Sequence, residues 1–224
     1  METLEYKTID KSEWSRGPWD NEPDKKQWLD EETGFPCLIV RGPSGALCGY
    51  VGVSKSHPFF GVSYHSSAEE GEDWSGAYNR TPGGLIDVHG GLTFSDKCVD
   101  HSREKFEKWK ENILSRKAQE EREKYPIGDA SRRWKNWGHL VDDYEGWVKK
   151  LEATSICHTV CCGEDDEVWW FGFDCAHSGD VSPAYDSLGG SFSYESYYRT
   201  LGYVTTEVKS LARQLKQLAT ELTS

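Results

Sequence analysis

Residues 168–180 read V-W-W-F-G-F-D-C-A-H-S-G-D, an aromatic run that ends in reactive side chains. The run is apolar enough to form a buried β-strand, and rigid strands often present functional groups where they end. Asp174 and His177 would point to opposite faces if the strand continued. Ser178 and Gly179 favour a turn instead, and a turn would let the two side chains converge.

A second segment, residues 85–91 (L-I-D-V-H-G-G), also ends in a reactive side chain, a histidine, followed here by two glycines. We expect residues 83–95 to form another strand. If the two segments meet, their histidines and aspartates form a cluster suited to a divalent metal and a water nucleophile. Without a metal, His177 would be a general base with His89 as its acid partner. The predicted catalytic residues, which are also the candidate metal ligands, are His89, Asp174, His177 and Asp180.

A small polar, nucleotide-like ligand would need further contacts beside this cluster. The glycine amides next to His89 could hold an oxyanion or phosphate, although a double glycine equally marks a tight turn. Residues 153–162 and 168–175 read as an antiparallel hairpin that places His158 on the same face as Asp174. A core histidine bonded to a backbone carbonyl explains His158 equally well. The predicted ligand contacts are Gly90, Gly91, His158, Trp170 and Cys175.

The cysteines favour buried free thiols over a structural zinc site. The chain has seven cysteines, and Cys157 and Cys161 form a C-x-x-x-C pattern in a strand-like run. Residues four apart in a strand lie about 13 Å from one another, too far for one zinc ion. Cys175 as a nucleophile is a further alternative, because His177 would share its face of a strand.

Composition excludes several classes of partner. The net charge of −12 argues against nucleic acid, which needs a cationic surface. No run of about 18 apolar residues predicts a membrane span. The first residues show no signal peptide, so the odd number of cysteines fits reduced thiols in the cytoplasm. The 10 tryptophans and 11 tyrosines predict an aromatic core, with a few rings lining a ligand pocket.

The expected architecture is a single α+β domain over residues 1–224, with a largely antiparallel sheet. Residues 37–41 and 46–53 read as two strands around a turn, and residues 10–35 as an irregular tryptophan-rich arm. Residues 101–152 form a helical insertion with one helix over 102–124 and another over 131–151. A C-terminal helix over 195–222 carries an apolar stripe that docks on the sheet or, alternatively, forms a homodimer seam.

The peptides V-H-G-G-L-T-F-S and W-W-F-G-F-D-C-A-H-S-G-D resemble a family of uncharacterised proteins encoded by bacteriophages and bacteria. The resemblance implies an accessory protein inside the host cell and carries no established activity. Two functions remain open. In one, the histidine–aspartate cluster either binds the small polar ligand or hydrolyses it. In the other, the protein inhibits a host defence protein through a tryptophan-rich surface with acidic clusters at residues 69–73 and 164–167.

Overall fold

The computed structural model of this chain describes residues 3–65, 81–120, 137–156, 167–186 and 196–223. By its internal contacts the chain divides into two compact units, residues 1–98 with 158–224 and residues 99–157. The first unit holds a six-stranded antiparallel sheet and a long C-terminal helix, which confirms the α+β class. The helical insertion predicted at residues 101–152 lies within the second unit.

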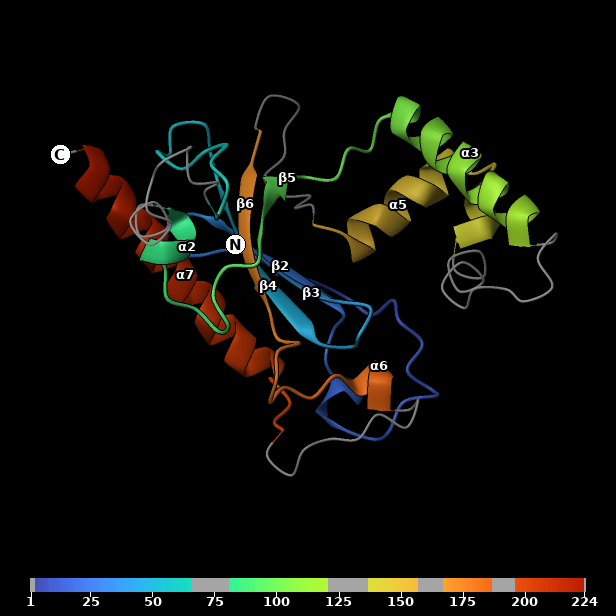
Figure 1. The fold of residues 1–224 in the computed structure, drawn as a ribbon, viewed down its shortest axis with the longest axis horizontal. Coiled ribbons are helices and arrows are strands. Elements are labelled where there is room, and N and C mark those ends of the chain that lie inside the picture. The colour runs from blue at the N-terminus through green and yellow to red at the C-terminus, as the bar shows by residue number, and fades with distance from the viewer. Residues whose placement is uncertain (1–2, 66–80, 121–136, 157–166, 187–195, 224) are drawn as a thin grey trace, which may run out of the picture. The chain divides into compact units, whose positions relative to one another are not determined.

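The sheet has the strand order β1-β2-β3-β4-β6-β5 (Figure 1). Its strands are β1 (Leu4–Tyr6), β2 (Lys25–Leu29), β3 (Pro36–Arg41), β4 (Leu47–Val53), β5 (Phe94–Lys97) and β6 (Trp169–Asp174). The predicted pair around the G-P-S-G turn is confirmed as β3 and β4, with Arg41 opposite Leu47.

The aromatic strand β6 does not form the predicted hairpin with residues 153–162. It lies between β4 and β5 and bonds to both. Residues 153 and 154 belong instead to a helix, and residues 157–162, including His158, lie outside the described residues.

Glycines opposite aromatic rings explain why β6 pairs with β4. Gly172 lies opposite Tyr50, and Gly49 lies opposite Phe173. A Cβ atom on Gly172 would be 2.2 Å from Tyr50 Cδ1, and one on Gly49 would be 2.5 Å from Phe173 Cζ. Each ring therefore fills the space that a side chain on the opposite strand would need, and this fit fixes the register.

The predicted irregular arm, residues 10–35, is corrected in its second half. Residues 25–29 form β2, which pairs with β1 and β3. Its sequence K-K-Q-W-L is polar, yet Lys25 and Gln27 are fully buried. The pattern missed this strand because buried polar side chains do not give an apolar alternation. The first half contains only a short 3-10 helix, η1 (Pro18–Asp20).

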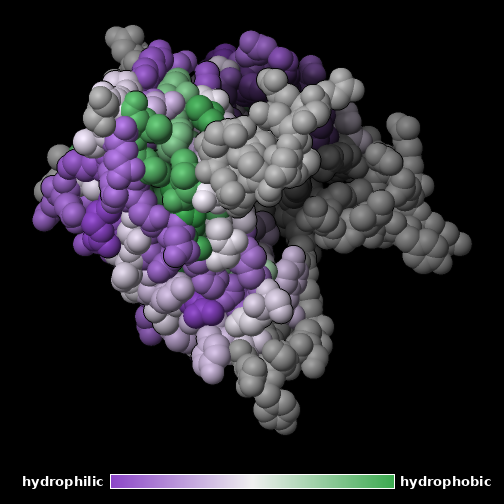
Figure 2. Space-filling model, turned by 60° about the vertical axis from the view of Figure 1, so that its left-hand side comes forward, coloured by the Kyte–Doolittle hydropathy of each residue, from purple (hydrophilic) through white to green (hydrophobic). Residues whose placement is uncertain are grey.

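Helix α7 (Leu201–Thr223) closes one face of the sheet by packing on β3 and β4 (Figure 1). Its stripe is buried: Val204, Val208, Leu211, Ala212 and Leu215. The docking of this stripe on the sheet is confirmed, so a homodimer through α7 stays a prediction that would need another face of the helix. Figure 2 shows a band of apolar side chains on the side that carries α7, between hydrophilic surfaces. None of the described helices is long and apolar enough to cross a bilayer.

The second unit contains α3 (Arg103–Glu120), η2 (Gly138–Leu140) and α5 (Tyr144–Thr154). Phe106 and Trp147 lie at its core, with ring centroids 5.3 Å apart. The helix predicted over residues 131–151 is wrong in its described part, because η2 and α5 are separate. Asp143 separates η2 from α5: as the N-cap of α5, its side chain accepts a hydrogen bond from the Gly146 N–H.

A fully buried guanidinium ties the N-terminal arm to the segment that precedes α7. The Arg41 side chain, at the end of β3, donates to Asp24 at 3.0 Å, to Glu22 at 3.3 Å and to the Tyr198 hydroxyl at 2.8 Å. Asp24 also pairs with Lys11 at 2.6 Å. Burial by itself raises the pKa of Asp24, but hydrogen bonds from Lys11 and two backbone amides lower it overall. Asp24 is therefore ionised in the folded protein at neutral pH.

We expect Asp24→Asn to destabilise the protein by about 3–5 kcal/mol at pH 7, since it breaks a buried ion pair. Because the pKa of Asp24 is lower in the folded protein, the stabilisation by its ion pairs is complete above the pKa of the unfolded chain, about 3.9. It is lost as the pH falls through the pKa of the folded protein. Thermal unfolding from pH 7 to pH 2.5 measures this. The difference in melting temperature between wild type and D24N should decrease below about pH 4. The exposed Asp10→Asn is the control; an equal effect there would contradict the ion-pair explanation.

Candidate functional site

The chain turns after the end of β6, as the sequence suggests. After β6 ends at Asp174, the Asp180 N–H donates to the His177 carbonyl at 2.9 Å. Gly179 has φ +90°, the value that the third position of a type II turn requires. The turn brings the side chain of Asp180 back beneath the His177 backbone, whose N–H donates to Asp180 Oδ2 at 3.1 Å.

The second segment is not the strand predicted for residues 83–95. Residues 82–85 form the short helix α2 (Pro82–Leu85), with Pro82 at its start, and β5 begins only at Phe94. His89 lies in a turn that the Gly91 N–H closes by donating to the Val88 carbonyl at 2.9 Å. A turn, rather than a strand, therefore presents His89.

Gly90 makes room for the imidazole of His177. Its φ is +66°, and a Cβ atom there would lie 2.2 Å from His177 Cε1. Gly91 also has a positive φ, +82°, but a Cβ atom there would meet nothing within 4 Å. Of the two glycines, Gly90 alone is therefore required by the approach of the two segments.

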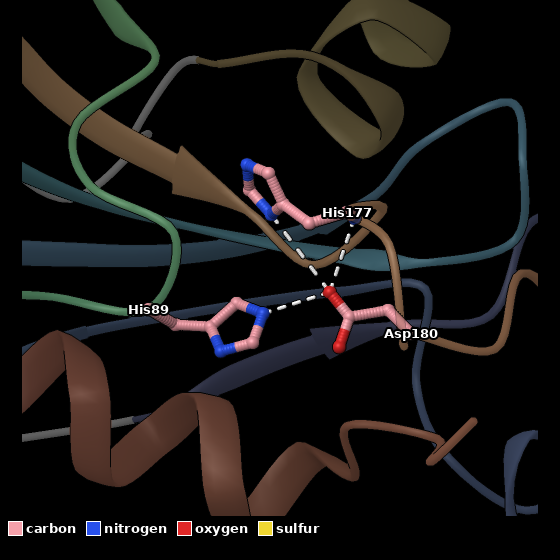
Figure 3. A group of neighbouring side chains, drawn as sticks. All are labelled: His89, His177 and Asp180. Carbon is pink, nitrogen blue, oxygen red and sulfur yellow. Dashed lines mark hydrogen bonds and ion pairs between the residues drawn. The ribbon is translucent and has the colours of Figure 1, made fainter. Parts of the chain in front are cut away.

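The two segments bring His89, His177 and Asp180 together (Figure 3). One ligand atom from each residue lies within 4.8 Å of the other two. Asp180 Oδ2 is 2.7 Å from His89 Nε2 and 3.8 Å from His177 Nδ1. His177 Nδ1 is buried and has no hydrogen-bond partner among the described residues.

Asp180 is held as an ionised carboxylate. Its side chain is 1% exposed, and its Oδ1 accepts a hydrogen bond from Arg199 Nε at 2.7 Å. Burial by itself raises the pKa of Asp180, but hydrogen bonds from Arg199, His89 and the His177 amide lower it overall. A parallel bridge between Asp180 and Tyr197 brings Arg199 alongside. The contact to Arg199 leaves Oδ2 turned to the two histidines.

The orientation of His89 is fixed from the side away from Asp180. Its Nδ1 is 3.1 Å from the Tyr203 hydroxyl, and its backbone N–H donates to Glu207 at 2.9 Å. Both partners belong to the first two turns of α7. Because Tyr203 engages Nδ1, Nε2 is the ring nitrogen that faces Asp180.

Asp174, the fourth predicted residue, lies beside the cluster of three. Its Oδ1 is 3.8 Å from His177 Nδ1 and accepts a hydrogen bond from the Ala176 N–H at 3.0 Å. It is one-third exposed, so it is the carboxylate of the site that meets solvent.

Of the five predicted ligand contacts, Gly90 lies against the His177 ring, and the others that the structure describes do not belong to the cluster. Cys175 and Trp170 are buried, and burial raises the pKa of the Cys175 thiol, which disfavours a thiolate nucleophile. The Trp170 indole N–H donates to Cys98 Sγ. The Gly91 amide is used in its own turn, whereas no described residue accepts from the Gly90 amide. His158 lies outside the described residues, and the cysteines that the structure describes form no disulfide.

Two functional side chains, Arg199 and Tyr203, were missed by the sequence interpretation. The segment Y-Y-R-T-L-G-Y read only as the start of a helix, and helical spacing gives no sign that Arg199 meets a carboxylate 19 residues earlier. The helix begins at Leu201, six residues later than predicted, and the preceding residues carry the bridge to Asp180.

The arrangement supports two kinds of chemistry. Two imidazoles and one carboxylate on one side of a centre are a common ligand set for a divalent transition metal. Without a metal, a buried aspartate that orients a histidine is a general acid–base pair.

Comparisons with known proteins leave the site to be read from its own geometry: no protein-family model, no curated protein and no solved structure matches the chain.

Because Asp180 is buried and His177 is partly exposed, removal of the two side chains should lower the stability of the protein by different amounts. We expect Asp180→Ala to destabilise the protein by about 2–3 kcal/mol, because Arg199 and His89 lose their shared acceptor. His177→Ala should shift the melting temperature by only a few degrees, since that side chain is one-third exposed. Thermal unfolding of both variants measures this. Loss of the fold in H177A would mark His177 as structural.

Proposed function

We propose that the protein is a metal-dependent hydrolase that binds a small polar, nucleotide-like ligand at His89, His177 and Asp180. The observation that carries the proposal is the convergence of three ligand atoms within 4.8 Å. They come from two turns far apart in the sequence, and one of the nitrogens is buried with no hydrogen-bond partner among the described residues. A metal ion would satisfy that nitrogen.

The two donor separations around Asp180 lie near those of a metal site. Ligand bonds of about 2.0–2.1 Å in a tetrahedral site separate the donor atoms by about 3.3 Å. Around Asp180 Oδ2 the separations are 2.7 Å and 3.8 Å, on either side of that value. A metal would take the place of the proton between His89 Nε2 and Asp180, so the contact that orients the pair also prepares it for an ion.

The outer contacts support the same interpretation. Metal-binding histidines usually engage their second ring nitrogen with a neighbouring group, and Tyr203 plays that part for His89. Arg199 holds Asp180 Oδ1 and leaves Oδ2 for the metal. Imidazole with carboxylate suits Zn²⁺, Mn²⁺ or Fe²⁺. Such an ion lowers the pKa of a bound water to about 7 and so supplies a nucleophile for hydrolysis.

The other function predicted from the sequence, inhibition of a host defence protein, depends on segments outside the described residues. Of its two acidic clusters, only Glu167 is described, and it pairs with Lys55 at 3.2 Å and Lys97 at 3.7 Å. That function stays a prediction. The bacteriophage setting and the cytoplasm belong to the proposal through the resemblance of the two peptides alone.

Metal content tests the proposed function directly. We expect untagged protein purified without chelator to carry about one equivalent of Zn²⁺, Mn²⁺ or Fe²⁺ per chain, measured by plasma mass spectrometry. Loss of one imidazole ligand typically weakens binding by orders of magnitude, so His89→Ala and His177→Ala should purify without metal. Hydrolysis of a panel of nucleotides should appear in the metal-loaded protein and vanish with chelator. A metal-free wild type that cannot be loaded would contradict the proposal.

Two neighbouring glycines give a sharper version of this test. Gly90→Ala and Gly91→Ala both force a Cβ atom on a left-handed backbone, at a cost of about 1–2 kcal/mol each. Only G90A pushes against the His177 ring. We therefore expect similar losses of thermal stability but a loss of bound metal in G90A alone. Equal metal content in both variants would contradict the role of His177 as a ligand.

A further inference from the structure

Arg199 is held in place by one hydrogen bond, and most of its N–H donors meet no acceptor in the part of the chain that the structure describes. Its Nε donates to Asp180 at 2.7 Å, and its guanidinium carbon lies 5.1 Å from the centre of the Tyr203 ring. No described residue accepts from its two terminal nitrogens, and the side chain is 29% exposed. A guanidinium has five N–H donors, so four of them have no acceptor among the described residues and can meet a ligand.

The same residues close a ring of contacts, the Arg–Asp–His–Tyr ring: Arg199, Asp180, His89 and Tyr203. Its steps are 2.7 Å from Arg199 to Asp180, 2.7 Å from Asp180 to His89, and 3.1 Å from His89 to Tyr203. The stacking of Arg199 on Tyr203 completes it. A residue of this ring cannot move without disturbing the others, so the terminal nitrogens of Arg199 have a fixed position beside the candidate metal ligands.

The geometry points to Arg199 as the residue that binds a phosphoryl group of the substrate, next to the metal that the proposed function places at His89, His177 and Asp180. This inference rests on that proposed function. Arg199 and a divalent metal would flank a single buried carboxylate, Asp180, and present two cationic groups to one ligand. A planar pair of N–H donors matches two oxygens of a phosphate, and the remaining oxygens are free to meet the metal. The substrate class is therefore a phosphate ester.

The test measures binding of inorganic phosphate to the metal-loaded full chain by titration calorimetry, with metal content determined on the same samples. We expect wild type to bind phosphate only when metal is present. Arg199→Gln should keep its metal and bind phosphate about tenfold more weakly or worse. Arg213→Gln is the matched control, because Arg213, on α7, likewise pairs with a carboxylate, that of the exposed Glu32, at 3.4 Å. It should bind phosphate as wild type does.

Arg199→Lys is a second variant, needed if R199Q loses its metal. It keeps a cation beside Asp180 but lacks the paired N–H donors of arginine. R199K should hold metal and bind phosphate more weakly than wild type. Phosphate binding by R199K or by metal-loaded R199Q that equals wild type would overturn the inference and leave the metal site standing. Acetate bound as tightly as phosphate would overturn the phosphate class. A wild type that takes up no metal would overturn both proposals.

Discussion

The rest of the first unit depends on the buried charge of Arg41. A guanidinium with no exposure is costly unless its donors are satisfied, and here they reach the arm, the β3–β4 turn and Tyr198. Glu22, which pairs with Arg41, also accepts from the Leu201 N–H at 2.7 Å and so caps the start of α7. One ion-pair network therefore sets both the path of the N-terminal arm and the point where the closing helix begins.

The segment before α7 carries this constraint to the candidate site. Three consecutive residues contact two partners: Tyr197 bridges the backbone of Asp180, Tyr198 bonds to Arg41, and Arg199 bonds to the Asp180 side chain. Because the Tyr198 hydroxyl bonds to both Arg41 and Glu22, the residues on either side of it have little freedom. The position of the Asp180 carboxylate thus follows from an ion-pair network that shares no side chain with it.

The sequence predicted the parts of the fold that have apolar periodicity, namely β3, β4, β6 and the buried stripe of α7. It missed β2, whose inward residues Lys25 and Gln27 are polar, and it paired β6 with the wrong segment. The glycines of L-C-G-Y-V-G-V and W-W-F-G-F were the available signal, since each lies opposite an aromatic ring. At the site, the turn residues predicted the approach of Asp174 and His177, whose Oδ1 and Nδ1 atoms lie 3.8 Å apart. Arg199 and Tyr203 were not predictable, because their contacts arise from tertiary packing alone.

The contacts of the Arg41 network and of the candidate site join residues that are far apart in the sequence. They therefore form later than local contacts. Arg41 meets a residue 157 positions later, Glu22 one 179 positions later, and His89 one 91 positions later. Contacts of such long sequence separation close late in folding, after the local hairpins and helices. His177 and Asp180 meet within one local turn, whereas His89 joins them through contacts with Asp180 and with Tyr203 of α7, which is synthesised later. A metal bound as proposed would therefore be taken up by the finished fold and not by the nascent chain.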